Sequence, residues 1–240
     1  MISTPTQPSP VTPPAVTNGA NSVFNEILAN PALAARRMSV APGTVLYEPH
    51  TPAQNLYFIH RGQIRTYVVG TDDYGRLIDI LGQDAWFGEA SLAKHGTYNE
   101  QAVAVVPTIV TEVPADRFLA HLVHNPRAAT ELYKQLAQKL TAAREDAAGL
   151  VFDDCHSRLV KALVRFSRSA AAAPHGDGVV LRITHEQLAQ AIGVARETVS
   201  LALTQLRQRN LLRTGRNQLM FNPEVLRGFC GPARKLNQAG

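Results

Sequence analysis

The chain has little of the chemistry on which exported and metal-binding proteins rely. It contains only two cysteines among 240 residues, Cys155 and Cys230. Two thiols so far apart are too few for a zinc ribbon or a cysteine-ligated iron–sulfur cluster, and we expect both to be reduced. No run approaches the roughly 18 apolar residues of a membrane span, and the first residues lack the pattern of a signal peptide. We therefore expect a cytoplasmic protein with no membrane partner.

The residue patterns of common catalytic sites are also missing. Eight histidines are present, but no two have the His-x-His spacing that metal-dependent oxygenases and isomerases often use. The chain has neither a Gly-x-Ser-x-Gly nucleophile motif nor a phosphate-binding loop. No histidine is marked as an axial ligand of haem. We therefore predict no catalytic residue and no metal site.

Charge is low overall and unevenly distributed. The net charge is +5, with 18% charged and 45% hydrophobic residues, a composition typical of a globular protein with room for two domains. Residues 153–240 hold 13 Lys and Arg against 6 Asp and Glu, which gives +7, whereas residues 1–152 hold 11 against 13, which gives −2. A basic C-terminal part indicates a polyanionic partner, and we expect double-stranded DNA.

Residues 183–212 predict two short helices joined by a glycine turn. Thr184 is placed to cap the first helix, with Gln187 reaching back in a capping box. Gly193 ends that helix, and a second helix opens near Ala195 with an apolar stripe of period 3.6. The apolar residues of the two helices are Leu188, Ala189, Ile192, Val199, Ala202, Leu203 and Leu206. Two helices that pack at a steep angle around a small turn form a helix-turn-helix.

The exposed side of the second predicted helix carries the chemistry for reading DNA. Arg196 can donate two hydrogen bonds to guanine O6 and N7, and Glu197 can accept one from cytosine N4. Both lie at the N-terminal end of the helix, where recognition helices meet base edges. Phosphates position a protein without specifying sequence. The side chains placed for them are Thr184, His185, Thr198, Ser200 and, at the tip of a β-hairpin predicted within residues 212–221, Arg216.

Four segments, in this order and spacing, resemble the cyclic-AMP receptor protein and fumarate-nitrate regulator (Crp/Fnr) family of bacterial transcription factors. They are LYFIHRGQIRTYV, FGEASL, NPRAATELYKQLAQKLTAAREDAAGL and the R-E-T-V that begins at Arg196. The resemblance implies an α+β fold with an N-terminal double-stranded β-helix jelly roll of the cyclic-nucleotide-binding kind, a long dimerisation helix and a C-terminal winged helix-turn-helix. It also implies a homodimeric transcription regulator on a palindromic site, with RNA polymerase as a further partner. Where that family has a second base-reading arginine, this chain has Leu201.

The predicted domain boundaries follow shifts in composition and pattern. Residues 1–22 are rich in Pro, Ser and Thr and hold no charged side chain, so we predict a disordered tail. Residues 23–126 are predicted to form the sensor domain, which begins with a short helix over about residues 23–35. Residues 127–152 are predicted to form the dimerisation helix, and residues 153–240 the winged helix-turn-helix domain.

Strands alternate with turns through the predicted sensor domain. Residues 55–67 alternate between apolar and polar side chains, and Arg61-Gly62 predicts a hairpin between two strands. Residues 103–113 predict another strand, which Pro107 interrupts as it would an edge strand or a bulge. Beyond the sensor, residues 170–178 are predicted to form a loop.

The long helix predicted after Asn125 and Pro126 is the expected dimer contact. Apolar residues recur in it at spacings of three and four, which gives a narrow stripe suited to pairing with a second copy. They are Leu132, Leu136, Leu140, Ala143, Ala147 and Leu150. The alternative is a helix that packs only on its own sheet.

The effector pocket departs from the pattern of the cyclic-nucleotide branch of the family. In that branch a Gly-Glu pair binds ribose, and a later Arg-Ser-Ala contacts the cyclic phosphate. Gly88 and Glu89 match the first element, but the second reads Asn99, Glu100 and Gln101, with no arginine. A phosphate beside Glu100 would meet a like charge, which disfavours cyclic AMP.

Two basic residues of the long helix suggest another ligand. Lys139 and Arg144 would suit a small anionic effector, and the nitrogen-control branch of the family senses 2-oxoglutarate. Two alternatives stay open: both residues are solvated flanks of a coiled coil, or the regulator is constitutively active without a ligand. Because fold alone does not exclude catalysis, the alternative for the whole chain is a jelly-roll (cupin-like) metal-dependent enzyme with an accessory nucleic-acid-binding domain.

Overall fold

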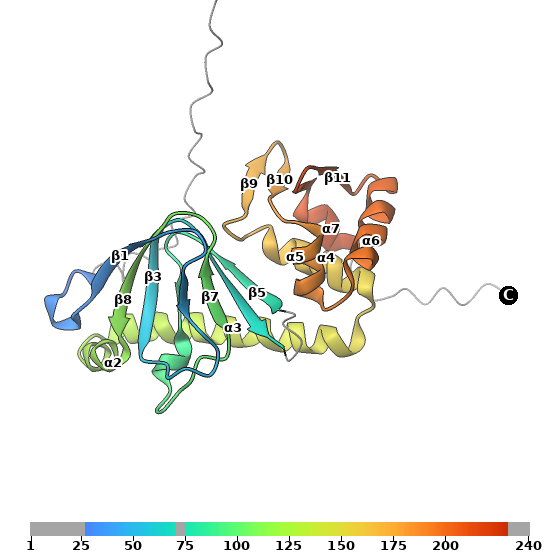
Figure 1. Ribbon diagram of the computed structural model, residues 1–240. Helices are drawn as coiled ribbons and strands as arrows, with labels where there is room; N and C mark the ends of the chain where they lie inside the picture. Colours follow the sequence, from blue (N-terminus) through green and yellow to red (C-terminus); the bar gives the residue numbers. More distant parts are fainter. Residues whose placement is uncertain (1–26, 71–74, 230–240) are drawn as a thin grey trace, which may run out of the picture.

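The computed structural model describes residues 27–70 and 75–229. They form an N-terminal β-sandwich, a long helix beneath it and a smaller C-terminal domain of helices and a sheet (Figure 1). The predicted tail, residues 1–22, and Cys230 lie outside the described residues. The α+β fold class, with a jelly-roll sensor, a long helix and a winged helix-turn-helix, is confirmed.

The sandwich consists of two four-stranded antiparallel sheets. The first sheet contains, in spatial order, β1 (Arg36–Val40), β8 (Thr108–Pro114), β3 (Asn55–Arg61) and β6 (Trp86–Phe87). The second contains β2 (Val45–Tyr47), β7 (Gln101–Ala104), β4 (Ile64–Val69) and β5 (Gly75–Leu81). Aromatic and aliphatic side chains from both sheets meet between them in one buried cluster. Consecutive strands therefore often lie in different sheets, as in a jelly roll.

Two of the strand predictions need correction. Arg61 and Gly62 do form a turn, but β3 and β4 on either side of it belong to different sheets and do not pair. Gly62 has a φ of 106°, and a Cβ there would lie 2.6 Å from the Cα of Thr108. The chain therefore requires glycine where it passes from the first sheet to the second. Pro107 separates β7 from β8, which also lie in different sheets, so it marks neither an edge nor a bulge.

Strand β3 is buried on both faces, which explains why its sequence is continuously apolar rather than alternating. Tyr57 and Ile59 face the interior of the sandwich. Leu56 and Phe58 face the opposite way, into a cluster with the two helices that follow the sheet, α2 (Ala115–Val123) and α3 (Pro126–Phe152). The predicted alternation over residues 55–67 was therefore wrong for this strand.

The start of the sensor domain is less helical than expected. Residues 27 and 28 are helical, but a short 3₁₀ helix, η1 (Pro31–Leu33), follows, capped by the side chain of Asn30. Proline removes a backbone donor inside a helix, so a continuous helix through residue 35 is excluded. Residues 23–26 of that prediction lie outside the described residues.

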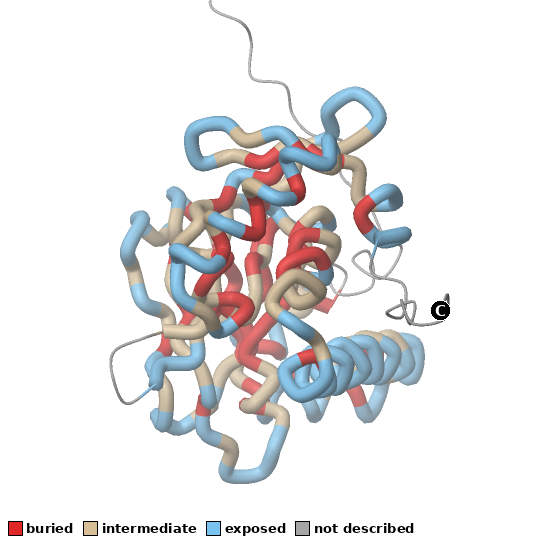
Figure 2. Tube along the Cα trace, turned by 90° about the vertical axis from the view of Figure 1, so that its right-hand side faces the viewer, coloured by how far each residue is buried: buried red, intermediate tan, exposed pale blue. Residues whose placement is uncertain are grey.

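The long helix α3 begins as the sequence predicted. The Asn125 side chain accepts a hydrogen bond from the backbone N–H of Ala128, and Pro126 occupies the first turn. Figure 2 shows that most of this helix is exposed on the side away from the sandwich. Its opposite side packs on the sensor through Ala128, Leu132 and Leu136 and, further along, through Lys139.

The C-terminal domain places three helices around a four-stranded sheet. The helices are α4 (Cys155–Phe166), α5 (His185–Ile192) and α6 (Arg196–Gln208), and a short α7 (Pro223–Phe229) follows. The sheet contains, in spatial order, β11 (Leu212–Gly215), β12 (Gln218–Phe221), β10 (Gly178–Leu181) and β9 (Ala172–His175). The loop predicted over residues 170–178 was wrong in part, because β9 pairs with β10 there.

The sensor and the C-terminal domain share one hydrophobic core. Leu77 and Ile80 of β5 belong to the same buried cluster as the apolar faces of α4, α5 and α6. At the end of β5, Gly82 lies so close to Ala170 that an added Cβ would be 2.3 Å from the alanine Cβ. The second sheet of the sensor therefore lies directly against the helix-turn-helix.

Candidate nucleic-acid interface and sensor interior

The helix-turn-helix is held together by the local interactions that the sequence predicts. The backbone N–H of Gln187 donates to the Thr184 hydroxyl at 3.1 Å, and the backbone N–H of Thr184 donates to the Gln187 side chain at 3.0 Å, which completes the capping box. Gly193 ends α5 with a φ of 68°. Val199 is fully buried against α5, so the two helices cross tightly.

The solvent face of α6 presents the two predicted base-reading side chains. Arg196 and Glu197 are both exposed in the first turn. Across residues 27–70 and 75–229, neither side chain forms an ion pair with another residue. Leu201, one turn further along, is 63% exposed. A free arginine and a free carboxylate at the N-terminal end of a helix are available to base edges.

Two of the predicted phosphate-binding side chains contact each other. The His185 imidazole Nδ1 lies 2.9 Å from the Ser200 hydroxyl, which itself donates to the Arg196 carbonyl oxygen at 3.0 Å. Burial and, to a lesser degree, the Arg196 charge lower the pKa of His185 below its usual value. His185 thus links α5 to α6 and positions the recognition helix, while its contact with a phosphate stays a prediction.

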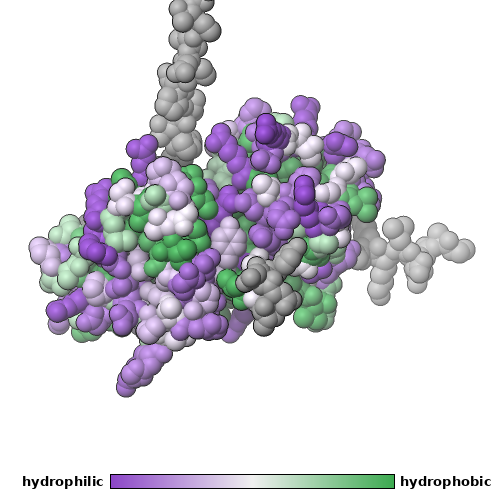
Figure 3. Space-filling model, in the orientation of Figure 1, coloured by the Kyte–Doolittle hydropathy of each residue, from purple (hydrophilic) through white to green (hydrophobic). Residues whose placement is uncertain are grey.

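The remaining predicted contacts lie around these helices. Thr198 is exposed on α6. Arg216 is exposed in the turn between β11 and β12, next to Asn217, which has a φ of 54°. The hairpin is the predicted wing, and its turn puts Arg216 at the outer end, where a phosphate can be reached. Figure 3 shows hydrophilic side chains over much of this domain.

A half-buried ion pair already lies at the position of the predicted pocket. Glu89 follows Gly88, which has a φ of 85° and would place a Cβ 2.9 Å from the Asn55 carbonyl oxygen. Lys139 reaches in from α3, and its Nζ donates to Glu89 Oε1 at 2.9 Å. The same ammonium donates to the Trp86 carbonyl oxygen at 3.3 Å and lies 4.4 Å from the centre of the Trp86 ring. Lys139 is therefore the hydrogen-bond partner of Glu89, the residue that was predicted to lie in the effector pocket.

Glu100 adds a second carboxyl group to this interior. It accepts a hydrogen bond from the Tyr47 hydroxyl at 3.1 Å. Burial and the neighbouring Glu89 charge raise the pKa of Glu100, and burial also raises the pKa of Asp79 on β5. Each of these carboxyl groups that remains ionised beside the paired Lys139 opposes the entry of a further negative charge.

Three other residues of the predicted pocket are not brought into it. Asn99 is exposed, and the Gln101 amide donates to Glu48 at 2.9 Å on the surface. Arg144 lies on the exposed side of α3, whereas Lys139 lies on the side that faces the sensor. The proposal that Lys139 and Arg144 converge in the same pocket is therefore wrong within one chain. Five residues separate them, which on a helix is about 140° of rotation.

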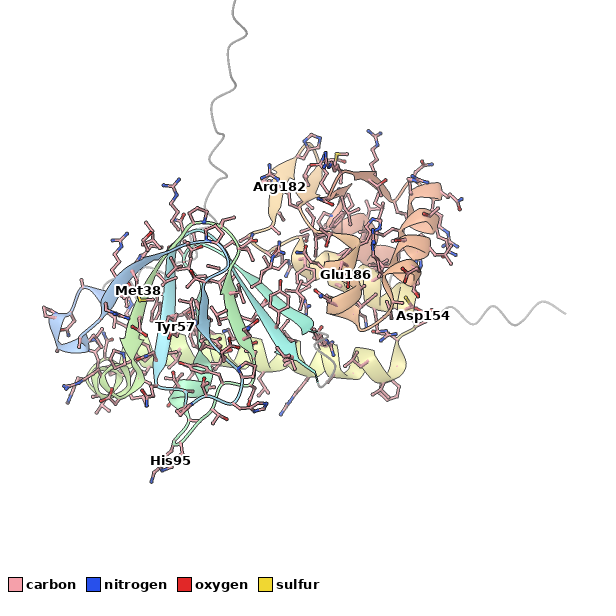
Figure 4. The ribbon with its side chains drawn as sticks, viewed as in Figure 1. Met38, Tyr57, His95, Asp154, Arg182 and Glu186 are labelled. Carbon is pink, nitrogen blue, oxygen red and sulfur yellow. The ribbon has the colours of Figure 1, made fainter. Side chains whose placement is uncertain are left out.

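The sequence did not single out the aromatic side chains that fill the interior. The rings of Tyr47 and Tyr98 stack with centroids 3.8 Å apart, and those of Tyr57 and Phe87 stack at 5.2 Å. Figure 4 shows Tyr57 inside the sandwich. Tyrosines on strands are common, and the pairing of β2 with β7 and of β3 with β6 that brings these rings together depends on contacts distant in sequence.

Two structural findings concern metal-binding proteins and membrane-spanning proteins. Within the described ranges, no group of three or more His, Cys, Asp or Glu side chains is arranged to hold a metal ion. No helix in residues 27–70 and 75–229 combines the length and apolar character needed to cross a membrane.

Two protein-family models match the chain. The cyclic nucleotide-binding domain model covers residues 37–125, which is the sandwich with α2. The Crp-like helix-turn-helix domain model covers residues 157–229, which is α4 through α7. Both matches coincide with elements described above, and α3 joins them. Neither supports the metal-dependent enzyme that was the alternative.

Curated relatives match across both parts of the chain. The cAMP-activated global transcriptional regulator CRP of Pasteurella multocida is 28% identical over 67% of this chain and 77% of its own length. The CRP-like cAMP-activated global transcriptional regulator of Mycobacterium tuberculosis is 26% identical over 77% of this chain and 83% of its own length. Among solved structures, the c-di-GMP-responsive global regulator CLP of Xanthomonas campestris has a TM-score of 0.69 at 23% identity and covers 84% of this chain and 98% of its own.

Proposed function

This chain belongs to the Crp/Fnr family of DNA-binding transcription regulators, and from that premise we propose that it reads a palindromic DNA site as a homodimer. The observation that carries the proposal is the exposed first turn of α6. There Arg196 and Glu197 are free of protein partners among the described residues, on a helix anchored by a capped α5. In this proposal Arg196 reads guanine and Glu197 reads the cytosine of a neighbouring pair.

Dimerisation is proposed to use the exposed face of α3. Of the predicted stripe, Leu132 is buried in the sensor core and Leu136 is partly buried against it. Leu140 is 53% exposed, Tyr133 is 71% exposed and Val151 is 74% exposed. With Ala137, Arg144 and Ala147 between them, these residues recur every three or four positions along one side of the helix. That spacing is the seam of a two-stranded coiled coil.

Selection of DNA from a random pool tests the proposal. The purified chain should enrich a palindrome whose half-sites are about 34 Å, or one helical turn, apart, because two-fold symmetry puts the two α6 helices in successive major grooves. The measurement is sequencing of duplexes retained at a salt concentration that removes non-specific attraction. Enrichment of a single unrepeated half-site, or of no site, would contradict a dimer that reads DNA through α6.

We propose further that the sensor interior does not take cyclic AMP in the manner of the family. The phosphate would meet Glu100 in place of an arginine, and the ribose would compete with Lys139 for Glu89. A 2-oxoglutarate-like anion is disfavoured for the same reason, because Lys139 is already paired with Glu89 and Arg144 lies outside. The ion pair instead supports the hypothesis of a sensor that holds its active shape without a ligand in this interior.

Titration calorimetry distinguishes these possibilities. Cyclic AMP and 2-oxoglutarate should each give no saturable heat with the full chain at millimolar concentration and no rise in its melting temperature. Heat from 2-oxoglutarate that is lost in Lys139→Ala would restore the anion hypothesis. Saturable heat from cyclic AMP would overturn the argument from Glu100.

The partners and location follow from the same proposal. A regulator that binds the chromosome acts in the cytoplasm and passes its signal to RNA polymerase. The support for both is the bacterial origin and the regulatory activity of the relatives.

A further inference from the structure

A groove runs between the second sheet of the sensor and the wing of the C-terminal domain. Its basic residues are Arg65 on β4, Arg182 just after β10, and Arg216 in the wing turn. Thr184 and Gln187, which form the cap of α5, lie between them. Figure 4 places Arg182 on the side of the C-terminal domain nearer the sensor. The groove is therefore built by both domains.

The three arginines have no negative partner in the described part of the chain. None of them takes part in an ion pair there, although seven such pairs occur elsewhere in residues 27–70 and 75–229. Among residues 27–70 and 75–229, no carboxylate lines the groove. Three like charges that line one groove without a counter-ion repel one another, so an anion bound among them is favoured.

Arg65 is the least expected member of the group. Its neighbours in β4, Ile64 and Thr66, point into the sandwich and are buried, so Arg65 points outward toward the C-terminal domain. Its Nε is buried and has no hydrogen-bond partner among the described residues. A buried guanidinium nitrogen without an acceptor is costly, and an oxyanion in the groove would supply the acceptor.

The backbone around the groove also favours a negative group. The first turn of α5 begins at His185, so the positive end of the helix dipole lies beside Thr184. The capping box uses the Thr184 and Gln187 side chains and leaves the arginines as the donors for a ligand. Guanidinium groups bind phosphate oxygens through paired N–H donors.

We propose that Arg65, Arg182 and Arg216 form an anion-binding groove that takes two or more neighbouring phosphate groups and links the sensor to the DNA-binding domain. The phosphates belong either to a free phosphorylated ligand, such as a nucleotide, or to the DNA backbone. In both cases the sensor domain contacts the bound phosphates directly through Arg65. Only the DNA source rests on the proposed function.

The first arm of the test uses inorganic pyrophosphate and no DNA. Calorimetric titration of the full chain should give saturable heat, and Arg65→Gln and Arg182→Ala should each weaken the binding by at least about tenfold. Arg127→Ala, which removes an exposed arginine of α3 far from the groove, is the matched control and should bind pyrophosphate as the unmodified chain does. This result supports a free phosphorylated ligand.

The second arm uses duplex DNA and variation of salt. If the DNA backbone is the source, Arg65→Gln should weaken binding to every sequence alike and reduce the slope of log K against log salt by about one. Arg127→Ala should leave that slope unchanged. Circular dichroism melting of each variant shows that it is folded, and Arg182 and Arg216 are exposed, so their loss leaves the core intact.

The two arms together decide the proposal. Either a pyrophosphate effect or a salt-slope effect specific to the groove variants supports it. If Arg65→Gln and Arg182→Ala behave as Arg127→Ala does in both arms, the groove binds no phosphate and the proposal is overturned. If the unmodified chain binds no DNA, the proposed function fails, but the pyrophosphate arm still tests the groove.

Discussion

Replacing Leu140 with lysine should convert the protein from a dimer to a monomer and weaken its binding to a palindromic site by at least about 100-fold. Leu140 lies near the middle of the exposed seam of α3 and is 53% exposed in the single chain. In a two-fold pair its copies would meet, so two lysines would bring like charges together in an apolar contact. The second half-site then loses the effective concentration that a linked partner provides.

The measurements for this variant are sedimentation of the protein and titration of a palindromic duplex. Gln138→Lys is the matched control, because it adds the same charge to an exposed position on the other side of the same helix. That control should remain dimeric and bind DNA with unchanged affinity. If Leu140→Lys stays dimeric, α3 does not pair through this face and the dimer uses another surface.

Replacing Arg196 with alanine should reduce affinity for the preferred site by about 1–3 kcal/mol, which is roughly 5- to 150-fold, and relax the preference at one base position. Arg196 is exposed in the first turn of α6 and has no ion pair within residues 27–70 and 75–229. A bidentate arginine contact distinguishes guanine from the other bases, so its loss should matter only when that guanine is present.

Binding curves with the preferred duplex and with each base substitution measure this effect. Arg207→Ala is the control, because Arg207 is exposed on the same helix but in its last turn, away from the end that meets base edges. It should leave the base preference intact. Uniform weakening by Arg196→Ala on all duplexes would show that Arg196 contacts only phosphate and that another residue reads the base.

The features that the sequence predicted well are those fixed by residues close together along the chain. The capping box joins residues three apart, Gly193 takes the left-handed conformation that ends α5, and Asn125 with Pro126 begins α3. Each depends on a hydrogen bond or a backbone preference within one helical turn. The neighbours in sequence are then also the neighbours in space.

The features that the sequence predicted poorly depend on contacts between distant segments. The stripe from Leu132 to Leu150 was assigned to the dimer, yet its first part is covered by the sensor. Arg61 and Gly62 looked like a hairpin turn, yet the strands on either side join different sheets. An apolar residue indicates burial, but the pattern does not say which surface buries it.

In the sensor interior, too, short motifs were predicted from the sequence, whereas a contact between distant residues was not. Gly88 and Glu89 were identified from their motif, and the lack of an arginine near Glu100 was visible in the sequence. The ion pair of Glu89 with Lys139 joins residues 50 positions apart. It exists because α3 passes beneath the sheet that carries Trp86, which a linear pattern does not specify.

The sequence by itself determined the family and the helix-turn-helix that presents Arg196 and Glu197, because these rest on local helix signals and a short motif. Only the tertiary structure decided which face of α3 remains exposed and which basic side chain pairs with Glu89 in the sensor. It alone brought Arg65 beside Arg182 and Arg216, which lie more than 100 positions further along the chain. The physical reason is that packing of the two domains against one another sets these distances, and packing depends on all the surfaces at once.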